Sequence, residues 1–143
     1  MPAPTPCTED EVVHLVHSFY ARVRQDAQLG PIFNAHVDDW DHHLAKLVDF
    51  WSAALRGTGR YRGTPMVAHA ALPGLHPGLF HRWLELFRET CATLDNPPMR
   101  ERAEMLAARI ADSLWYGYQM QRDPDRLPAS LHAAATPPQP SRV

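Results

Sequence analysis

The stretch VDDWDHHLAKLVDFWSAALRGTG, residues 37–59, is the clearest amphipathic segment of the chain. Its apolar side chains recur every three or four residues, which is the spacing of one face of an α-helix. The run Gly57-Thr58-Gly59 ends the pattern, because glycine commonly follows the last turn of a helix. The stripe comprises Trp40, His43, Leu44, Leu47, Phe50, Trp51, Ala54 and Leu55. The stretch therefore predicts a long helix with one buried face.

Three flanking segments show the same helical period, at residues 8–26, 76–94 and 95–121. The first opens with Thr8 and Glu11, the spacing of a capping box. The last opens with Asn96 as the expected N-cap and Pro97 at the first helical position. The Gly-Pro break near residue 30 leaves room for at most a short turn of helix ending near Phe33. No segment alternates with a period of two, so the sequence predicts an all-α fold of four substantial helices.

Length, charge and cysteine content narrow the class of protein. A chain of 143 residues is long enough for one domain with a real core. A net charge of −2 and a pI near 6.5 give no electrostatic footprint for nucleic acid or an anionic membrane. The start MPAPTPCTEDE lacks the basic and apolar regions of a signal peptide, and no window approaches a membrane span. With two cysteines in unrelated contexts, we expect a cytoplasmic protein.

Proline marks the expected boundaries of the folded domain. Most of the 14 prolines fall in the first six residues, between residues 64 and 78, and in the C-terminal tail. We therefore expect a disordered N-terminal segment over residues 1–7 and a folded domain over residues 8–122. The remainder, residues 123–143, is predicted to be a proline-rich, disordered tail.

Two of the nine histidines stand in unusual surroundings. His43 lies on the apolar stripe of the 37–59 helix and should face inward. His69 lies in the short apolar segment MVAHAAL, which runs into Pro73-Gly74 and can form at most two turns of helix. Taken singly, His43 can be a core histidine with a local hydrogen bond, and His69 can cap a short helix.

The aromatic content favours an interpretation in which both histidines face one bound cofactor. The predicted helices carry more aromatic area than a tightly packed four-helix core of this length needs, in Phe19, Tyr20, Phe33, Phe50, Trp51, Phe80 and Trp83. A core that encloses a flat apolar group would bury this additional aromatic surface against that group. Haem is such a group, and its iron takes one imidazole on the proximal side. The alternative is a haem-free, all-helical sensor or interaction domain, in which the aromatic residues form an ordinary core.

The ordered set of motifs resembles the truncated haemoglobins, specifically their third group. FYARVRQDAQLGPIF is similar to the first retained helix and turn, DWDHHLAKLVDFW to the distal helix, GTGRYRGTPMVAH to the lead into the proximal histidine, and FHRWLELF to the next helix. The resemblance covers residues 9 to about 120, so it makes residues 8–122 a truncated globin domain. It implies a two-over-two helical sandwich enclosing haem b. The paired-glycine motifs of the other truncated groups are absent, which fits the third group.

The resemblance also implies roles for particular residues. His69 matches the proximal iron ligand, Tyr20 the distal phenol and Trp83 the indole donor beside the bound gas. His43 falls at the position of the distal histidine. Five further positions match haem contacts, with Lys46 placed to pair with a propionate. The complete set of expected haem contacts is Phe33, Lys46, Leu47, Phe50, Tyr61, His69 and Trp83.

The function implied by the resemblance is the binding of O₂, NO or CO at the iron. A phenol and an indole directed at a partly charged ligand would slow its release. Such a pocket would also suit redox turnover with an external reductase, either NO dioxygenation or peroxide reduction. Binding alone and turnover use the same residues, so the sequence leaves open whether the protein is an enzyme. We expect no nucleic-acid or membrane partner.

Overall fold

The computed structural model describes residues 7–59 and 74–131. These residues form helices and connecting loops, with no strand among them. The helices are α1 (Glu9–Gln25), α2 (Gly30–His36), α3 (Trp40–Arg56), α5 (Pro77–Cys91) and α6 (Pro97–Arg122). The prediction of an all-α fold with four substantial helices is confirmed. None of the described helices is long and apolar enough to cross a membrane.

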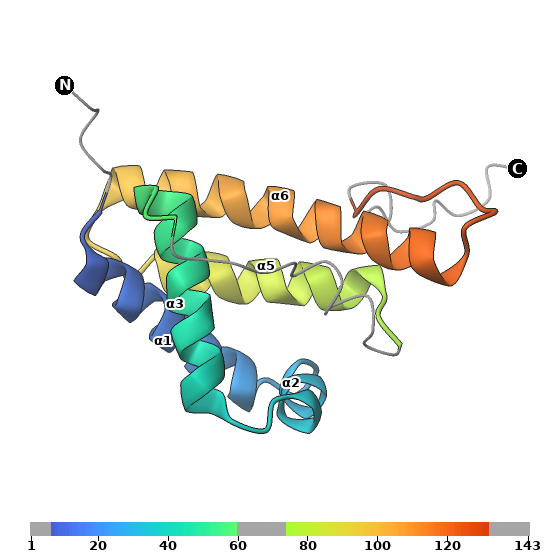
Figure 1. The fold of residues 1–143 in the computed structure, drawn as a ribbon, viewed down its shortest axis with the longest axis horizontal. Coiled ribbons are helices and arrows are strands. Elements are labelled where there is room, and N and C mark those ends of the chain that lie inside the picture. The colour runs from blue at the N-terminus through green and yellow to red at the C-terminus, as the bar shows by residue number, and fades with distance from the viewer. Residues whose placement is uncertain (1–6, 60–73, 132–143) are drawn as a thin grey trace, which may run out of the picture.

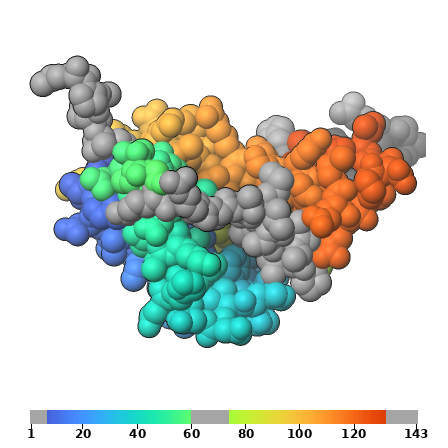
Figure 2. All heavy atoms as spheres, viewed as in Figure 1, coloured from blue at the N-terminus to red at the C-terminus, as the bar shows by residue number. Residues whose placement is uncertain are grey.

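The long helices pack as two pairs. Helix α1 packs against α3 and against α5, while α5 packs against α6 and α3 also contacts α6. In Figure 1, α5 and α6 run side by side along the length of the molecule, and α3 crosses them steeply. Helix α2 lies at the lower edge of this view, beside the ends of α1 and α3, where the space-filling view shows α2 and α3 forming the surface (Figure 2). This arrangement of two helices over two is the predicted sandwich.

The predicted helix caps at Thr8, Asn96 and Gly57 are confirmed. Thr8 and Glu11 form a reciprocal capping box, with the Thr8 backbone N–H donating to Glu11 Oε1 at 2.9 Å and the Glu11 N–H donating to Thr8 Oγ1 at 3.1 Å. Asn96 is the N-cap of α6, and its side chain accepts from the Met99 N–H at 3.1 Å. Gly57 ends α3 with φ of 69°, in the left-handed region that favours glycine.

Helix α2 differs from the prediction because it continues to His36, beyond Phe33. The extra turn is stabilised at its end. The Val37 N–H donates to the Phe33 carbonyl at 2.9 Å, and His36 Nδ1 lies 2.9 Å from the Ile32 carbonyl oxygen. The sequence pattern offered no sign of this, since the apolar period stops at Phe33.

Two clusters of buried side chains form the core. The larger joins α1, α3, α5 and the first half of α6, and within it the rings of Trp51 and Phe87 stack at 5.1 Å while Phe19 meets Phe87 edge to face at 5.0 Å. The smaller cluster lies between α5 and α6 and consists of Phe80, Ala111, Leu114 and Leu131.

Leu131 belongs to the segment that follows α6. Its side chain is only 3% exposed, and His81 Nε2 lies 3.1 Å from its carbonyl oxygen. The Gln119 amide binds the same segment twice, donating to the Ala129 carbonyl at 2.9 Å and accepting from the Ala129 N–H at 2.8 Å. Residues 123–131 of the predicted tail therefore fold back onto α5 and α6, and residues 132–143 lie outside the described residues.

Candidate functional site

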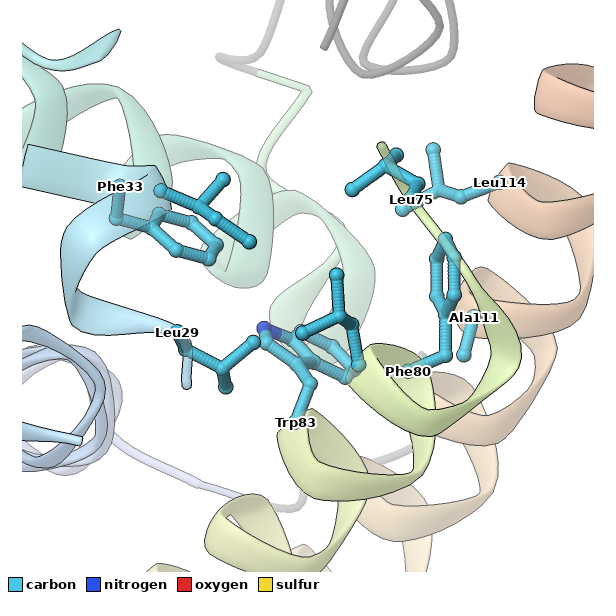
Figure 3. Close-up of a pocket in the computed structure, with 9 residues that line it drawn as sticks. Leu29, Phe33, Leu75, Phe80, Trp83, Ala111 and Leu114 are labelled. Atoms are coloured by element: carbon cyan, nitrogen blue, oxygen red, sulfur yellow. The ribbon is translucent and has the colours of Figure 1, made fainter. Parts of the chain in front are cut away.

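An apolar pocket opens between α2, α5 and α6. It encloses about 500 Å³ of empty space, counted with the solvent at its mouth. Figure 3 shows Leu29 and Phe33 on one side of it, Phe80 and Trp83 projecting from α5, and Ala111 and Leu114 behind them on α6. The lining residues are Leu29, Ile32, Phe33, Leu75, Leu79, Phe80, Trp83, Ala111 and Leu114. No charged side chain is among them, so the pocket suits an apolar occupant.

Tyr20 lies buried at the centre of a ring of aromatic side chains beside this pocket. Its ring centroid is 4.7 Å from that of Phe19, 6.0 Å from Phe33, 6.3 Å from Trp40 and 6.5 Å from His43. The helical period explains part of this, because Tyr20 follows Val16 by four residues on the buried face of α1. The Tyr20 ring is thus enclosed by side chains from α1, α2 and α3.

Burial raises the pKa of the Tyr20 phenol well above its ordinary value, and a hydrogen bond to Trp83 lowers it in part. Desolvation has this effect because the charged phenolate loses its hydration inside the protein. The phenol is therefore neutral at any physiological pH. Since the indole N–H can only donate, the Tyr20 oxygen is the acceptor in this bond.

Trp83 connects the Tyr20 ring cluster to the pocket. Its indole stacks on Phe87, with centroids 5.7 Å apart and planes 18° from parallel, and it meets Phe19 edge to face at 5.3 Å. The same side chain lines the pocket, as does Phe33. These two ring contacts hold the indole between Phe19 and Phe87. Side chains from α1, α2 and α5 therefore meet around Trp83.

His43 is half-buried on α3, on the inward stripe that the sequence predicted. Its imidazole is edge-on to Trp40, at 5.5 Å and 84°, as well as to Tyr20. The structure therefore brings together Tyr20, His43, Trp83 and Phe33, four of the predicted site residues, from four different helices.

The other predicted site residues are less closely grouped. Leu47 and Phe50 are half-buried on α3 and pack against the main core, where the ring of Phe50 contacts Trp51 at 5.7 Å. Lys46 is exposed on the same helix. His69 and Tyr61 lie outside the described residues.

Sequence reasoning did not assign most of the pocket lining. Leu79 and Leu114 were expected on buried helix faces. The helical period of apolar residues, however, cannot tell a side chain that lines a cavity from one that packs in the core. Ile32 and Leu29 flank Phe33 in a segment whose helix the sequence pattern cut short. Leu75 precedes α5 in a proline- and glycine-rich connector. The one available signal was that Leu29 and Ile32 are apolar residues close to Phe33, which was already expected to contact haem.

Two crossed pairs of helices, an apolar pocket beside them and a half-buried histidine on α3 are the features expected of a globin-type protein. The comparisons with known proteins agree. The family model described as "Bacterial-like globin" matches residues 7–114. A group 3 truncated haemoglobin of Campylobacter jejuni is 36% identical over 118 residues, covering 76% of this chain and 93% of that protein.

A solved structure gives the same answer. The crystal structure of a group III truncated haemoglobin from Campylobacter jejuni superposes with a TM-score of 0.70 at 35% identity, covering 80% of this chain and 92% of that one. The chain therefore belongs to the bacterial-like globin family, among the group III truncated haemoglobins. Membership of this family implies a haem globin that takes small diatomic ligands.

Proposed function

We propose that this protein holds haem b in the pocket between α2, α5 and α6 and binds O₂, NO or CO at the iron. The observation that supports it best is the meeting of Tyr20 and Trp83, two neutral hydrogen-bond donors, at the edge of a pocket with an apolar lining. The pocket fits a porphyrin, since aromatic side chains such as Phe33, Phe80 and Trp83 suit the face of a flat apolar ring. If haem is bound here, its iron would take one imidazole from the protein and a diatomic gas as ligands.

His69 is the proximal ligand in this proposal. It corresponds in sequence to the proximal histidine of the family, and it is the histidine of the short apolar segment between residues 64 and 73. Phe33, Leu47, Phe50, Tyr61 and Trp83 contribute apolar contacts to the porphyrin. Lys46 is exposed and carries a positive charge, which suits a propionate at the rim of the pocket.

Tyr20 and Trp83 act on the diatomic ligand. The Tyr20 oxygen accepts from the Trp83 indole, and within the described part of the chain no acceptor is seen for the Tyr20 O–H. That proton is thus left for a ligand of partial negative charge, and a rotation of the indole lets Trp83 share in the binding. A hydrogen bond to a partly charged acceptor in a dry site contributes about 1–3 kcal/mol. Such donors favour slow release over rapid exchange.

A pocket of this kind also supports redox turnover, and NO dioxygenation is the reaction we propose to test first, with peroxide reduction as the second. Both need electrons from a separate reductase. NO consumption by the O₂-loaded protein, measured with and without a flavin-dependent reductase and NADH, separates turnover from simple binding. A single turnover that does not repeat when the reductase is added would leave ligand binding as the function.

The haem assignment is tested by absorption spectra of the ferric, ferrous and CO-bound protein after expression with haem supplied. We expect the spectra of a haem held by one histidine. A colourless protein would contradict the proposal. It would favour the haem-free helical interaction domain instead.

A further inference from the structure

Asp26 organises the turn that connects α1 to α2. It is the C-cap of α1, and its Oδ2 accepts hydrogen bonds from the backbone N–H groups of Gln28 and Leu29, each at 3.0 Å. Its own carbonyl accepts from the Gly30 N–H at 2.9 Å. The carboxylate therefore fixes the position of Leu29, which is part of the pocket wall.

The other oxygen of the same carboxylate binds α5. Asp26 Oδ1 accepts from Arg82 Nε and lies equally close to Arg82 Nη2, at 2.7 Å in both cases. The Asp26 side chain is only 5% exposed, so this ion pair is shielded from water on the acidic side. Burial alone would raise the pKa of Asp26, but the hydrogen bonds from Arg82 and from the two amides hold it below its ordinary value. The three hydrogen bonds and the ion pair all favour the charged carboxylate.

This ion pair lies beside the two donors of the pocket. Arg82 directly precedes Trp83, and Asp26 is the residue at which α1, the helix of Tyr20, ends. The same two helices, α1 and α5, also meet where the rings of Phe19 and Trp83 make edge contact at 5.3 Å. A shift of α5 relative to the α1–α2 turn would change the distance between the phenol and the indole. The Asp26–Arg82 bond resists that shift.

We propose that Asp26 and Arg82 are positioning residues that keep the Trp83 indole in register with the Tyr20 phenol. Their effect on a gas ligand rests on the proposed function, whereas their effect on the Tyr20–Trp83 hydrogen bond does not. Neither residue lines the pocket. They act through α5, in the way that supporting hydrogen bonds fix the direction of groups that touch a ligand.

The first test is the ¹H–¹⁵N resonance of the Trp83 indole in the full-length protein with its haem, in the diamagnetic ferrous CO form. Trp83→Phe identifies the resonance, and Tyr20→Phe gives its position when the hydrogen bond is lost. Asp26→Asn keeps an acceptor for the two amides and removes the charge, and Arg82→Gln removes the guanidinium. In both variants we expect the resonance to move toward its Tyr20→Phe position. Arg82→Lys should restore it in part.

Glu85→Gln is the matched control, because Glu85 is the second, more exposed partner of Arg82, with Oε1 2.6 Å from Nη1. We expect its indole resonance to stay at the wild-type position. An unchanged resonance in Asp26→Asn and Arg82→Gln would overturn the proposal. So would an equal shift in Glu85→Gln. If Arg82→Gln does not fold, Asp26→Asn and Arg82→Lys decide the question.

The second test is ligand release by stopped flow. O₂ dissociation should speed up about tenfold in Asp26→Asn, the change that corresponds to about 1.4 kcal/mol, while CO dissociation stays nearly constant. In a Tyr20→Phe background the same substitution should add nothing. A further tenfold effect in that background would show that Asp26 acts elsewhere. A protein that binds no haem would remove the proposed function, and the indole resonance of the haem-free chain would still test the ion pair.

Discussion

The rings of Tyr20 and His43 lie 6.5 Å apart, centroid to centroid, and meet at 88°. The imidazole is half-buried on α3 and is also edge-on to Trp40. His43 is thus a half-buried neighbour of the phenol, and we predict that rotation about its side-chain bonds opens or closes a route to Tyr20. We therefore predict that His43 gates the site and does not bind iron strongly.

Replacement of His43 by Ala or Leu should therefore speed ligand entry and leave the CO-bound spectrum almost unchanged. Smaller or apolar side chains remove the swinging imidazole without touching the proximal side. Flash photolysis of the CO complex measures the bimolecular rate directly. A low-spin, bis-histidine ferrous spectrum in the wild type that disappears in His43→Ala would show instead that His43 binds the iron.

Tyr20→Phe and Trp83→Phe should raise the O₂ release rate by about ten- to a hundredfold. Each variant loses a hydrogen-bond donor worth about 1.4–2.8 kcal/mol, and each 1.4 kcal/mol is a factor of ten. CO carries little charge, so its release should change far less. The measurement is stopped-flow dissociation of both gases from the wild type, the two single variants and the double variant.

The contrast between the gases separates hydrogen bonding from packing. Trp83 stacks on Phe87 as well as donating to Tyr20, so its replacement also alters volume. Equal shifts for O₂ and CO would indicate steric repacking. No shift for either gas would remove both residues from the ligand site.

His69→Gly should lose haem, and added imidazole should restore binding. The glycine removes the only bond that we assign between the protein and the iron, and free imidazole can occupy the space. Absorption spectra of the variant with and without about 10 mM imidazole provide the readout, a concentration chosen above the millimolar affinity expected of so small a ligand. A histidine-type spectrum that survives in His69→Gly without imidazole would place the proximal ligand elsewhere.

Gly30→Ala should destabilise the protein by about 1–3 kcal/mol, as overpacking does in a closed site. A Cβ at this position would lie 2.6 Å from the Arg24 carbonyl oxygen, and the backbone cannot move aside cheaply. Gly78→Ala is the control. Its Cβ would meet only the imidazole of His76, at 3.0 Å, which can rotate away. Urea denaturation of the three proteins checks the difference, and an equal loss in both variants would contradict it.

The free energy of unfolding should fall as the pH drops from about 5 to about 3, because two carboxylates titrate lower in the folded protein than in the unfolded chain. The Thr8 backbone N–H and the Asn96 amide lower the pKa of Glu11 from its ordinary 4.5. Despite desolvation, Arg82 lowers the pKa of Asp26 from 3.8. Such groups stabilise the fold above the unfolded-state pKa and lose that effect as the folded form is protonated. Asp26→Asn should show a shallower acid dependence in urea titrations across this range.

The sequence predicted the long helices well because their apolar residues follow one period, and the caps at Thr8, Asn96 and Gly57 because these are local. It could not predict how far α2 runs, since the last turn depends on a hydrogen bond between His36 and the Ile32 carbonyl. Nor could period alone join Tyr20 to Trp83, which are 63 positions apart. That pairing came from the resemblance, and the structure brings the two side chains into contact.

Polar contacts between distant residues could not be predicted from the sequence either, because they also depend on how the helices pack. Asp26 and Arg82 are separated by 56 residues, and each reads alone as an ordinary solvated charge. The burial of Leu131 was hidden by composition, because the residues around it are rich in proline and alanine. Both contacts depend on how helices are placed in space, which no local pattern encodes.

The range matched by the family model stops at residue 114, inside α6, yet the chain closes its smaller apolar cluster only at Leu131. A fragment cut at the end of the match would lack the last two turns of α6, the Gln119 amide that ties Ala129, and Leu131 itself. Phe80 and Leu114 would then face water at the floor of the pocket. A fragment with boundaries drawn from the family match would thus expose apolar side chains of the smaller cluster and would be prone to aggregate. Any shortened form of the protein should therefore extend at least through Leu131.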